Sequence, residues 1–324
     1  MNERFSNNFD FLRFFAASLI IFSHSFALLL GYSNIFVYDW HLLAGQAGLA
    51  TLLVISGYLI PGSWERKPSL KIFFKKRILR IAPGLLASVL LVIFLIGPLV
   101  TSLTTPEYFL KVFAPSAWIS VPFYADGSEL GLFASNPVSY VNAPLWAIPF
   151  EFLLYGIVAF LAAAGLFFKK HSMIPFILGT ILLWMLWYEN PALNKIRFAV
   201  YFFIGAWLYI NKENFNIRTW MVLIPWIFVI LSYGTCFMFL FAFIAIPCTV
   251  IRFAYIPSNK LWNFGRYGDF SFGMFIYAYP LQQTIIHFIP EIQIPMMILL
   301  SYAVSIPAAV ISWQIIEKRA LLLK

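Results

Sequence analysis

The stretch that decides the fold is residues 71–101, which read KIFFKKRILRIAPGLLASVLLVIFLIGPLVT. Its first ten residues include three Lys and two Arg, whereas the 21 residues from Ile81 to Thr101 carry no charge. A helix rises about 1.5 Å per residue, so a run of about 20 apolar residues crosses the hydrocarbon core of a bilayer. The stretch therefore predicts a transmembrane helix over about 78–101, with its basic end on the cytoplasmic side.

Runs of the same kind continue on both sides of this stretch. Of the 324 residues, 62% are hydrophobic and 11% are charged, which is about half the charged share of a typical soluble domain. We expect an all-α, polytopic, multi-pass integral membrane protein with about ten transmembrane helices, forming one domain over residues 1–324 without an appended soluble domain. The expected spans are about 11–30, 45–62, 78–101, 145–167, 173–188, 196–211, 219–235, 236–252, 271–289 and 293–316.

The basic residues of the expected loops indicate the orientation of the chain. When alternate loops are placed on opposite sides, 18 Lys and Arg residues, Arg4 among them, lie on the side of the termini and three lie on the other. Basic loops favour the cytoplasm, so we expect both termini to be cytoplasmic. The net charge of +9 then reflects topology, and we expect no nucleic-acid partner. The weakest boundary is the short break at 233–235, where a miscount would reverse the last two spans.

Among the ionisable residues of the expected spans, Arg13, His24 and Glu151 are the functional candidates, because an uncompensated charge inside a membrane costs several kcal/mol. Arg13 and His24 are 11 residues apart, which places them on one face of the first helix, and they argue against a cleaved signal peptide there. Glu151 enters the fourth span from the outer side, at a depth similar to that of His24. A carboxylate beside an imidazole raises its basicity, so the pair is typical of a general base.

Each of these residues also has a structural interpretation. His24 and Glu151 could be polar contacts between helices, and Arg13 could extend its guanidinium to the inner headgroups. A set of polar residues in the expected ninth span also has two interpretations, since these residues could line a cavity or pack helices together. Its members are Tyr277, Tyr279, Gln282 and Gln283.

The basic end of the third span carries Arg77 and Arg80, which are three residues apart and therefore share a helix face. Two guanidinium groups can hold phosphate oxygens through paired hydrogen bonds. The positive-inside rule and anionic lipids produce the same pattern, so these two residues alone favour neither reading. The sequence has no phosphate-binding Gly-rich loop, metal-ligand cluster or Ser-His-Asp pattern, and we expect no metal site.

Taken in order, these residues resemble membrane acyltransferase family 3, the O-acyltransferases that modify bacterial polysaccharides and related glycans. The resemblance covers nearly the whole chain, and it is the shared order of short segments that makes it specific. The segments are Arg13 with His24, Ser56-Gly57-Tyr58-Leu59-Ile60, Arg77-x-x-Arg80-x-x-Pro83, Leu145-Trp146 with Glu151 and Tyr155, residues 268–280 (GDFSFGMFIYAYP), and Ile316-Glu317-Lys318.

The resemblance implies an enzyme of the bacterial inner membrane that moves an acyl group, most simply acetyl, from cytoplasmic acyl-CoA to a glycan or lipid-linked sugar. It implies that His24 is catalytic with Arg13 as its partner, and that Arg77 and Arg80 bind the acetyl-CoA co-substrate. We expect Glu151 to orient His24, and membrane lipids to surround the chain.

Two positions depart from the pattern of that family. Many members carry a further histidine where this chain has Ala278, and the usual closing proline is replaced by Arg319. A mechanism that uses a second histidine at that point is therefore not expected here.

A glycan or lipid-linked-sugar transporter is the alternative, because it also needs many spans and a buried polar cavity. The absence of internal repeats in the sequence counts against it. Covalent modification separates the two, since a transporter moves its cargo unchanged. A non-catalytic scaffold would leave Arg13, His24 and Glu151 without a reason to tolerate burial.

Overall fold

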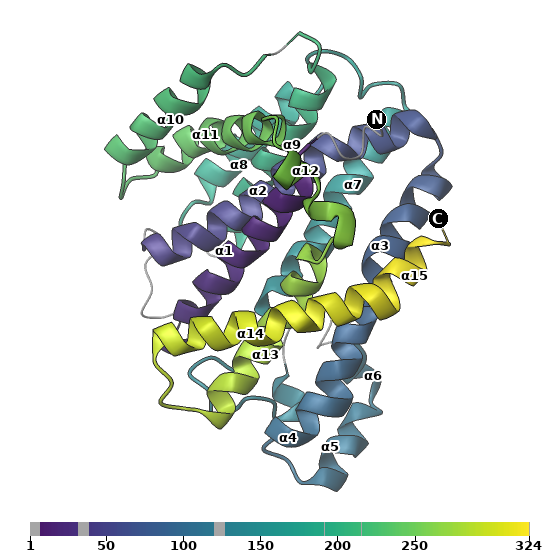
Figure 1. Ribbon diagram of the computed structural model, residues 1–324, viewed down its shortest axis with the longest axis vertical. Coiled ribbons are helices and arrows are strands. Elements are labelled where there is room, and N and C mark those ends of the chain that lie inside the picture. Colours follow the sequence, from purple (N-terminus) through teal and green to yellow (C-terminus); the bar gives the residue numbers. More distant parts are fainter. Residues whose placement is uncertain (1–6, 32–38, 120–126, 191, 215, 324) are drawn as a thin grey trace. The chain divides into compact units, whose positions relative to one another are not determined.

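The computed structural model describes residues 7–31, 39–119, 127–190, 192–214 and 216–323. Within these residues the chain is helical, and an isolated bridge between Thr101 and Leu132 is the single piece of β pairing (Figure 1). The expected all-α class is confirmed. Arg4, one of the basic residues used for the orientation, lies outside the described residues.

The helices follow the apolar runs, and each of the ten expected spans contains one. In chain order they are α1 (Phe9–Leu30), α2 (Trp40–Arg66), α3 (Leu70–Leu90), the π-helix η3 (Leu91–Ile96), α4 (Gly97–Val100), α5 (Thr105–Val112), α6 (Pro115–Ile119), η6 (Ala143–Trp146), α7 (Ala147–Ala163), α8 (Ile174–Leu186), α9 (Arg197–Ile210), α10 (Thr219–Leu231), α11 (Phe237–Ala254), α12 (Asn259–Trp262), α13 (Ser271–Phe288), α14 (Ile294–Ser312), η9 (Trp313–Glu317) and α15 (Lys318–Leu321).

Among the described residues, six helical stretches are long and apolar enough to cross a membrane, as expected of a multi-pass membrane protein. They are Phe9–Leu30, Trp40–Arg66, Leu70–Val100, Ala143–Ala163, Phe237–Ala254 and Ile294–Leu321. The apolar helices α8 and α10 have 13 residues each, which is about 20 Å at 1.5 Å per residue and less than the thickness of the hydrocarbon core. The total of ten spans and the cytoplasmic position of both termini stay predictions.

The uncertain boundary between the seventh and eighth runs is a turn between two helices. α10 ends at Leu231, α11 begins at Phe237, and Gly234 between them has a positive φ of 82°. Glycine adopts this conformation without the steric clash of a side chain. The two helices lie side by side (Figure 1), and Trp226 Nε1 donates a hydrogen bond to Thr249 Oγ1 at 2.8 Å. The predicted break is confirmed.

The chain divides into two compact units. The first comprises Met1–Ala16, Gln46–Phe74 and Glu151–Tyr267, and the second comprises Ala17–Gly45, Lys75–Phe150 and Gly268–Lys324. Four helices, α1, α2, α3 and α7, contribute one part of their length to each unit.

In the first unit, α2 and α9 pack at very short range. A Cβ atom built on Gly57 would lie 2.0 Å from the backbone oxygen of Phe202, and one on Gly205 would lie 2.4 Å from that of Val54. Small residues of this kind let helix backbones approach each other, which is a common way to join helices in lipid. Gly57, one of the residues that carry the family resemblance, therefore has a packing role.

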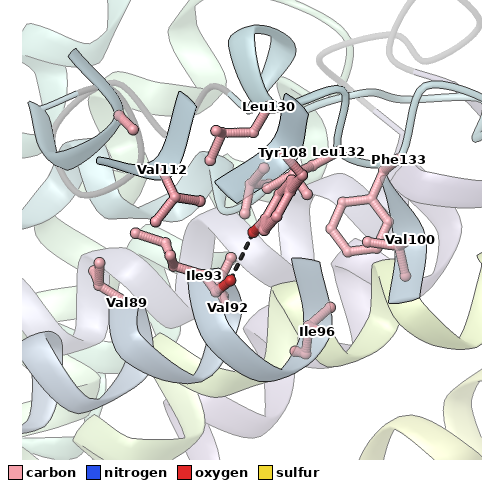
Figure 2. Packing of buried hydrophobic residues seen from close by; sticks show 12 residues of the cluster. Val89, Val92, Ile93, Ile96, Val100, Tyr108, Val112, Leu130, Leu132 and Phe133 are labelled. Carbon is pink, nitrogen blue, oxygen red and sulfur yellow. Dashed lines mark hydrogen bonds between the residues drawn. The ribbon is translucent and has the colours of Figure 1, made fainter. Parts of the chain in front are cut away.

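In the second unit, the long connection after α4 packs against the third expected span. Apolar side chains of α3, η3 and α4 contact those of α5, α6 and residues 130–141 (Figure 2). The buried members of this cluster are Val89, Val92, Ile93, Ile96, Val100, Tyr108, Val112, Ala117, Leu130, Leu132, Phe133 and Val141. Their burial holds the described part of the connection against the end of the span, at roughly 25 cal/mol per Å² of apolar surface.

One hydrogen bond inside this cluster joins the two layers. Tyr108 is fully buried, and its hydroxyl donates to the backbone oxygen of Ile93 in η3 at 2.6 Å (Figure 2). Burial raises the pKa of Tyr108 to about 12, which keeps the phenol protonated as a donor. A Cβ atom on Gly97 would lie 1.9 Å from the Tyr108 hydroxyl oxygen, so Gly97 leaves the space that this contact needs.

We expect Gly97→Ala to lower the melting temperature of the purified protein. The added methyl group displaces the Tyr108 hydroxyl and leaves a buried carbonyl unpaired, at a cost of about 1–3 kcal/mol. Gly179→Ala in α8 is the matched control, because nothing lies within 4 Å of a Cβ atom built there. Differential scanning fluorimetry in detergent measures both variants, and equal melting temperatures would contradict the packing described here.

Candidate active site

His24 lies in the part of α1 that belongs to the second unit. Its side chain is half-buried, and its ring contacts that of Tyr279 on α13 edge to face, with centroids 5.2 Å apart and planes at 82°. Among the described residues, neither ring nitrogen of His24 has a hydrogen-bond partner. A partly accessible imidazole with free nitrogens can accept a proton or act as a nucleophile.

The polar residues close to His24 in the fold are paired with one another. Gln282 on α13 is fully buried, and its amide nitrogen lies 2.9 Å from Ser25 Oγ and 3.0 Å from Ser301 Oγ. Gln283 donates to two backbone carbonyls of the segment before η6, at 2.7 and 2.6 Å. The amide nitrogens of both glutamines therefore serve packing, whereas Gln282 Oε1 is buried without a hydrogen-bond partner among the described residues.

A proline inside α13 shapes the position of the ring next to His24. Pro280 has no N–H to donate to the carbonyl of Ile276 one turn earlier. Asn142 Nδ2 and Ser88 Oγ donate to that oxygen instead, at 2.8 and 3.0 Å. Tyr279 directly precedes this proline, so contacts from η6 and α3 hold the part of α13 that faces the histidine.

Arg80 is the centre of a charged cluster in the second unit. Its guanidinium forms an ion pair with Asp269 at 2.5 Å and lies 3.9 Å from the carboxylate of Glu317. Glu317 is 2% exposed and accepts a further hydrogen bond from Ser312 Oγ at 2.9 Å. Two carboxylates therefore surround a single arginine, as a low-dielectric environment requires of a buried charge.

Aromatic rings and a glycine complete this cluster. The guanidinium carbon of Arg80 lies 5.9 Å from the ring centre of Phe272 and 5.5 Å from that of Trp313, which is a cation–π arrangement. Gly268 has a φ of 135°, and a Cβ atom there would lie 2.2 Å from the indole nitrogen of Trp313. Segments far apart in the sequence thus meet around one guanidinium.

The two arginines expected to bind phosphate lie one turn apart on α3. Arg77 is half-buried, and the guanidinium of Arg80 is engaged by Asp269 and Glu317. Both acidic residues belong to the segments that resemble the family, but the sequence does not connect them with Arg80. Asp269 lies 189 residues further along the chain, and no local spacing connects it to Arg80.

We expect Arg80→Gln to lower the melting temperature more than Asp269→Asn does. Loss of the arginine uncovers two carboxylates, one of them buried, at a cost of about 3 kcal/mol, whereas loss of Asp269 leaves Arg80 near Glu317. The double variant should lose less stability than the two single variants lose together, and the difference, which is the coupling energy, should be about 1–3 kcal/mol. Thermal unfolding of the four proteins measures this, and strict additivity would show that the ion pair contributes nothing.

Glu151 on α7 accepts hydrogen bonds from two hydroxyl groups of the first unit. Ser56 Oγ donates at 2.5 Å, and the hydroxyl of Tyr155, one turn along α7, donates to the same oxygen. Hydrogen bonds to a carboxylate are charge-assisted and hold its orientation firmly. The predicted role of Glu151 in orienting His24 stays a prediction, and the two hydroxyl partners are residues that sequence reasoning did not assign to it.

Arg13 lies on the same continuous helix as His24, as predicted. Its guanidinium pairs with Asp10 at 3.3 Å, with side chains 26% and 40% exposed, in the first turns of α1. Asn8 fixes this end of the helix, because its amide nitrogen donates to two backbone carbonyls at the end of α11, at 2.8 and 3.0 Å. The helix that carries both predicted catalytic residues is therefore firmly held at its start.

A buried cation in the first unit escaped sequence reasoning. Arg197 is 7% exposed at the start of α9. It donates to Gln46 Oε1 at 2.9 Å, and its guanidinium carbon lies 4.4 Å from the ring centre of Phe239. In the sequence, Arg197 is a single charge at the edge of an apolar run, and an exposed loop residue has the same pattern.

Comparisons with known proteins cover the same segments. A family model described as an acyltransferase domain matches residues 6–317, which include all of α1 to α14. An O-acetyl transferase of Shigella phage Sf6 is 29% identical over 98% of this chain and 96% of its own length. Nodulation protein 10 of Rhizobium leguminosarum bv. viciae is 33% identical over 46% of this chain and 42% of its own length. No solved structure matches the chain.

Proposed function

We propose, since this chain belongs to membrane acyltransferase family 3, that it moves an acyl group from cytoplasmic acyl-CoA to a hydroxyl of a cell-surface glycan or lipid-linked sugar. The phage relative named as an O-acetyl transferase supports acetyl as the group. The enzyme resides in the bacterial inner membrane, with about ten spans and both termini in the cytoplasm, as the basic loops predict.

The observation that supports this chemistry best is the environment of His24. The neighbouring polar groups Gln282, Ser25 and Ser301 bind one another, whereas the imidazole contacts a tyrosine ring and keeps its nitrogens free among the described residues. A histidine that served only to join helices would use a ring nitrogen in a hydrogen bond to a neighbouring helix. His24 is therefore available for proton transfer.

In the proposed reaction, His24 removes the proton of the acceptor hydroxyl as its oxygen attacks the thioester carbonyl of acetyl-CoA. The carbon–sulfur bond breaks, and the CoA thiolate takes up the proton that His24 had accepted. In a variant of this route, a His24 nitrogen attacks the thioester, the carbon–sulfur bond breaks and the CoA thiolate leaves. The acceptor oxygen then attacks the acetyl-histidine, the nitrogen–carbon bond breaks, and the released imidazole takes up the proton of the hydroxyl. Arg13 stabilises the negative charge that develops on the carbonyl oxygen, and Glu151 orients the imidazole.

The donor phosphates are assigned to Arg77 and Arg80. Asp269 and Glu317 already offset the charge of Arg80. Arg80 then acts mainly by keeping the basic end of α3 in place beside α13 and η9.

We expect His24→Ala to lower acetyl transfer by at least about a hundredfold, because it removes the proposed general base. The assay supplies membranes with radiolabelled acetyl-CoA and follows the mass of one acetyl group on surface glycans by mass spectrometry. His171→Ala, which removes an exposed histidine, is the matched control and should keep full activity. Undiminished transfer by His24→Ala would remove this histidine from the mechanism.

We expect Arg77→Ala to raise the KM for acetyl-CoA about tenfold, which corresponds to one lost charge-assisted hydrogen bond, and to leave the acceptor KM unchanged. Lys75→Ala is the control, because it removes the same charge from an exposed position of the same basic cluster. Steady-state kinetics with each substrate varied in turn separates the two constants. Equal changes in both variants would indicate a general interaction with anionic lipid.

A further inference from the structure

The first unit contains a pocket of about 380 Å³ at the ends of α9 and α11. Its polar lining consists of Tyr58, Lys212, Asn216, Arg252 and Tyr255. The expected topology places these helix ends on the cytoplasmic side, which is the side of soluble phosphorylated metabolites and of anionic headgroups.

The two cations of this pocket have no carboxylate partner. Lys212 and Arg252 are exposed, and within the described residues neither forms an ion pair or donates a hydrogen bond. The Lys212 ammonium lies 4.0 Å from the ring centre of Tyr209, whose hydroxyl donates to Glu65 at 2.5 Å. The positive charge of the pocket is therefore available to an anion.

Two tyrosine hydroxyls add neutral donors to the same pocket. Tyr58 is 5% exposed, and its hydroxyl oxygen lies 3.0 Å from that of Tyr255. One hydroxyl donates to the other, so the remaining hydroxyl hydrogen is free to donate to a ligand. Phosphate oxygens accept hydrogen bonds from ammonium, guanidinium and hydroxyl groups at once.

Basic residues at cytoplasmic helix ends also follow from the positive-inside rule and from the helix dipole. In that reading Lys212 and Arg252 would cap the last carbonyls of α9 and α11, but the described residues contain no such hydrogen bond. These cations instead share a pocket with a tyrosine pair and the amide of Asn216. We propose that this pocket binds a phosphate group of a phosphorylated ligand.

Two ligands could present this phosphate. One is the coenzyme A portion of the donor, a reading that rests on the proposed function, and the other is the headgroup of an anionic phospholipid. A volume of about 380 Å³ lies in the range of small-molecule sites and admits part of either. The pocket would recognise the phosphate of coenzyme A and that of a phospholipid through the same contacts, so the experiment tests each ligand separately.

The test uses the full chain in nanodiscs. The variant Lys212→Gln/Arg252→Gln removes both cations, and Lys212→Arg/Arg252→Lys keeps the charge as a check on folding. The matched control, Lys169→Gln/Lys170→Gln, removes two exposed lysines that the same topology places on the same side. Calorimetry measures binding of coenzyme A in phosphatidylcholine discs, and thermal unfolding measures stabilisation when phosphatidylglycerol replaces part of the phosphatidylcholine.

We expect the Gln variant to bind coenzyme A about a hundredfold more weakly, at about tenfold per cation, while the control and the charge-keeping variant bind as the wild type does. If coenzyme A binding is equal in all four proteins but stabilisation by phosphatidylglycerol is lost only in the Gln variant, the phosphate belongs to a lipid. If the Gln variant matches the control in both arms, the pocket binds no phosphate.

Acetyl transfer is measured in the same preparations, so that failure of the proposed phosphate site can be distinguished from failure of the proposed function. If the wild type transfers acetyl groups but the Gln variant binds both ligands as the control does, the phosphate pocket is wrong and the proposed enzyme stands. If the wild type transfers no acetyl group but the Gln variant loses ligand binding, the pocket is supported and the proposed enzyme is wrong.

Discussion

The charge of Arg80 and the two carboxylates around it form the constraint on which the second unit depends. A charge in a low-dielectric environment is costly unless it is paired and hydrogen-bonded. Asp269 lies just before α13, and Glu317 lies at the end of η9, so pairing with Arg80 brings the basic end of α3 to both. Phe272 and Trp313 cover the guanidinium and complete the arrangement.

The same rule applies to uncharged backbone groups, which lipid cannot hydrogen-bond. Where Pro280 leaves the Ile276 carbonyl without its helical partner, Asn142 and Ser88 supply donors. Where η3 interrupts the regular helix, Tyr108 donates to the Ile93 carbonyl. At these two irregular positions of the second unit, side-chain donors replace the missing backbone donors and join neighbouring segments.

Among the described residues, a few ionisable groups have no ionic or hydrogen-bond partner and can therefore meet a substrate or ligand. In the part of the chain that the structure describes, His24 keeps its ring nitrogens free in the second unit, and Lys212 and Arg252 keep their charges free in the first. An ionisable group inside a membrane is costly, so one that keeps its polar atoms accessible is a candidate for contact with a substrate or ligand. The first supports the proposed acyl transfer, and the others support a phosphate site.

The sequence by itself determined the helical class, the positions of the helices and the break at Gly234, because the length of an apolar run and the conformational freedom of glycine are local properties. It also pointed to Arg13, His24, Glu151 and the two arginines, since an ionisable group in or beside an apolar run is visible without a fold. Only the tertiary structure decided which partners these groups have. Ser56 lies 95 residues from Glu151 and Asp269 lies 189 residues from Arg80, and a contact of that range depends on how the helices pack rather than on any spacing in the chain.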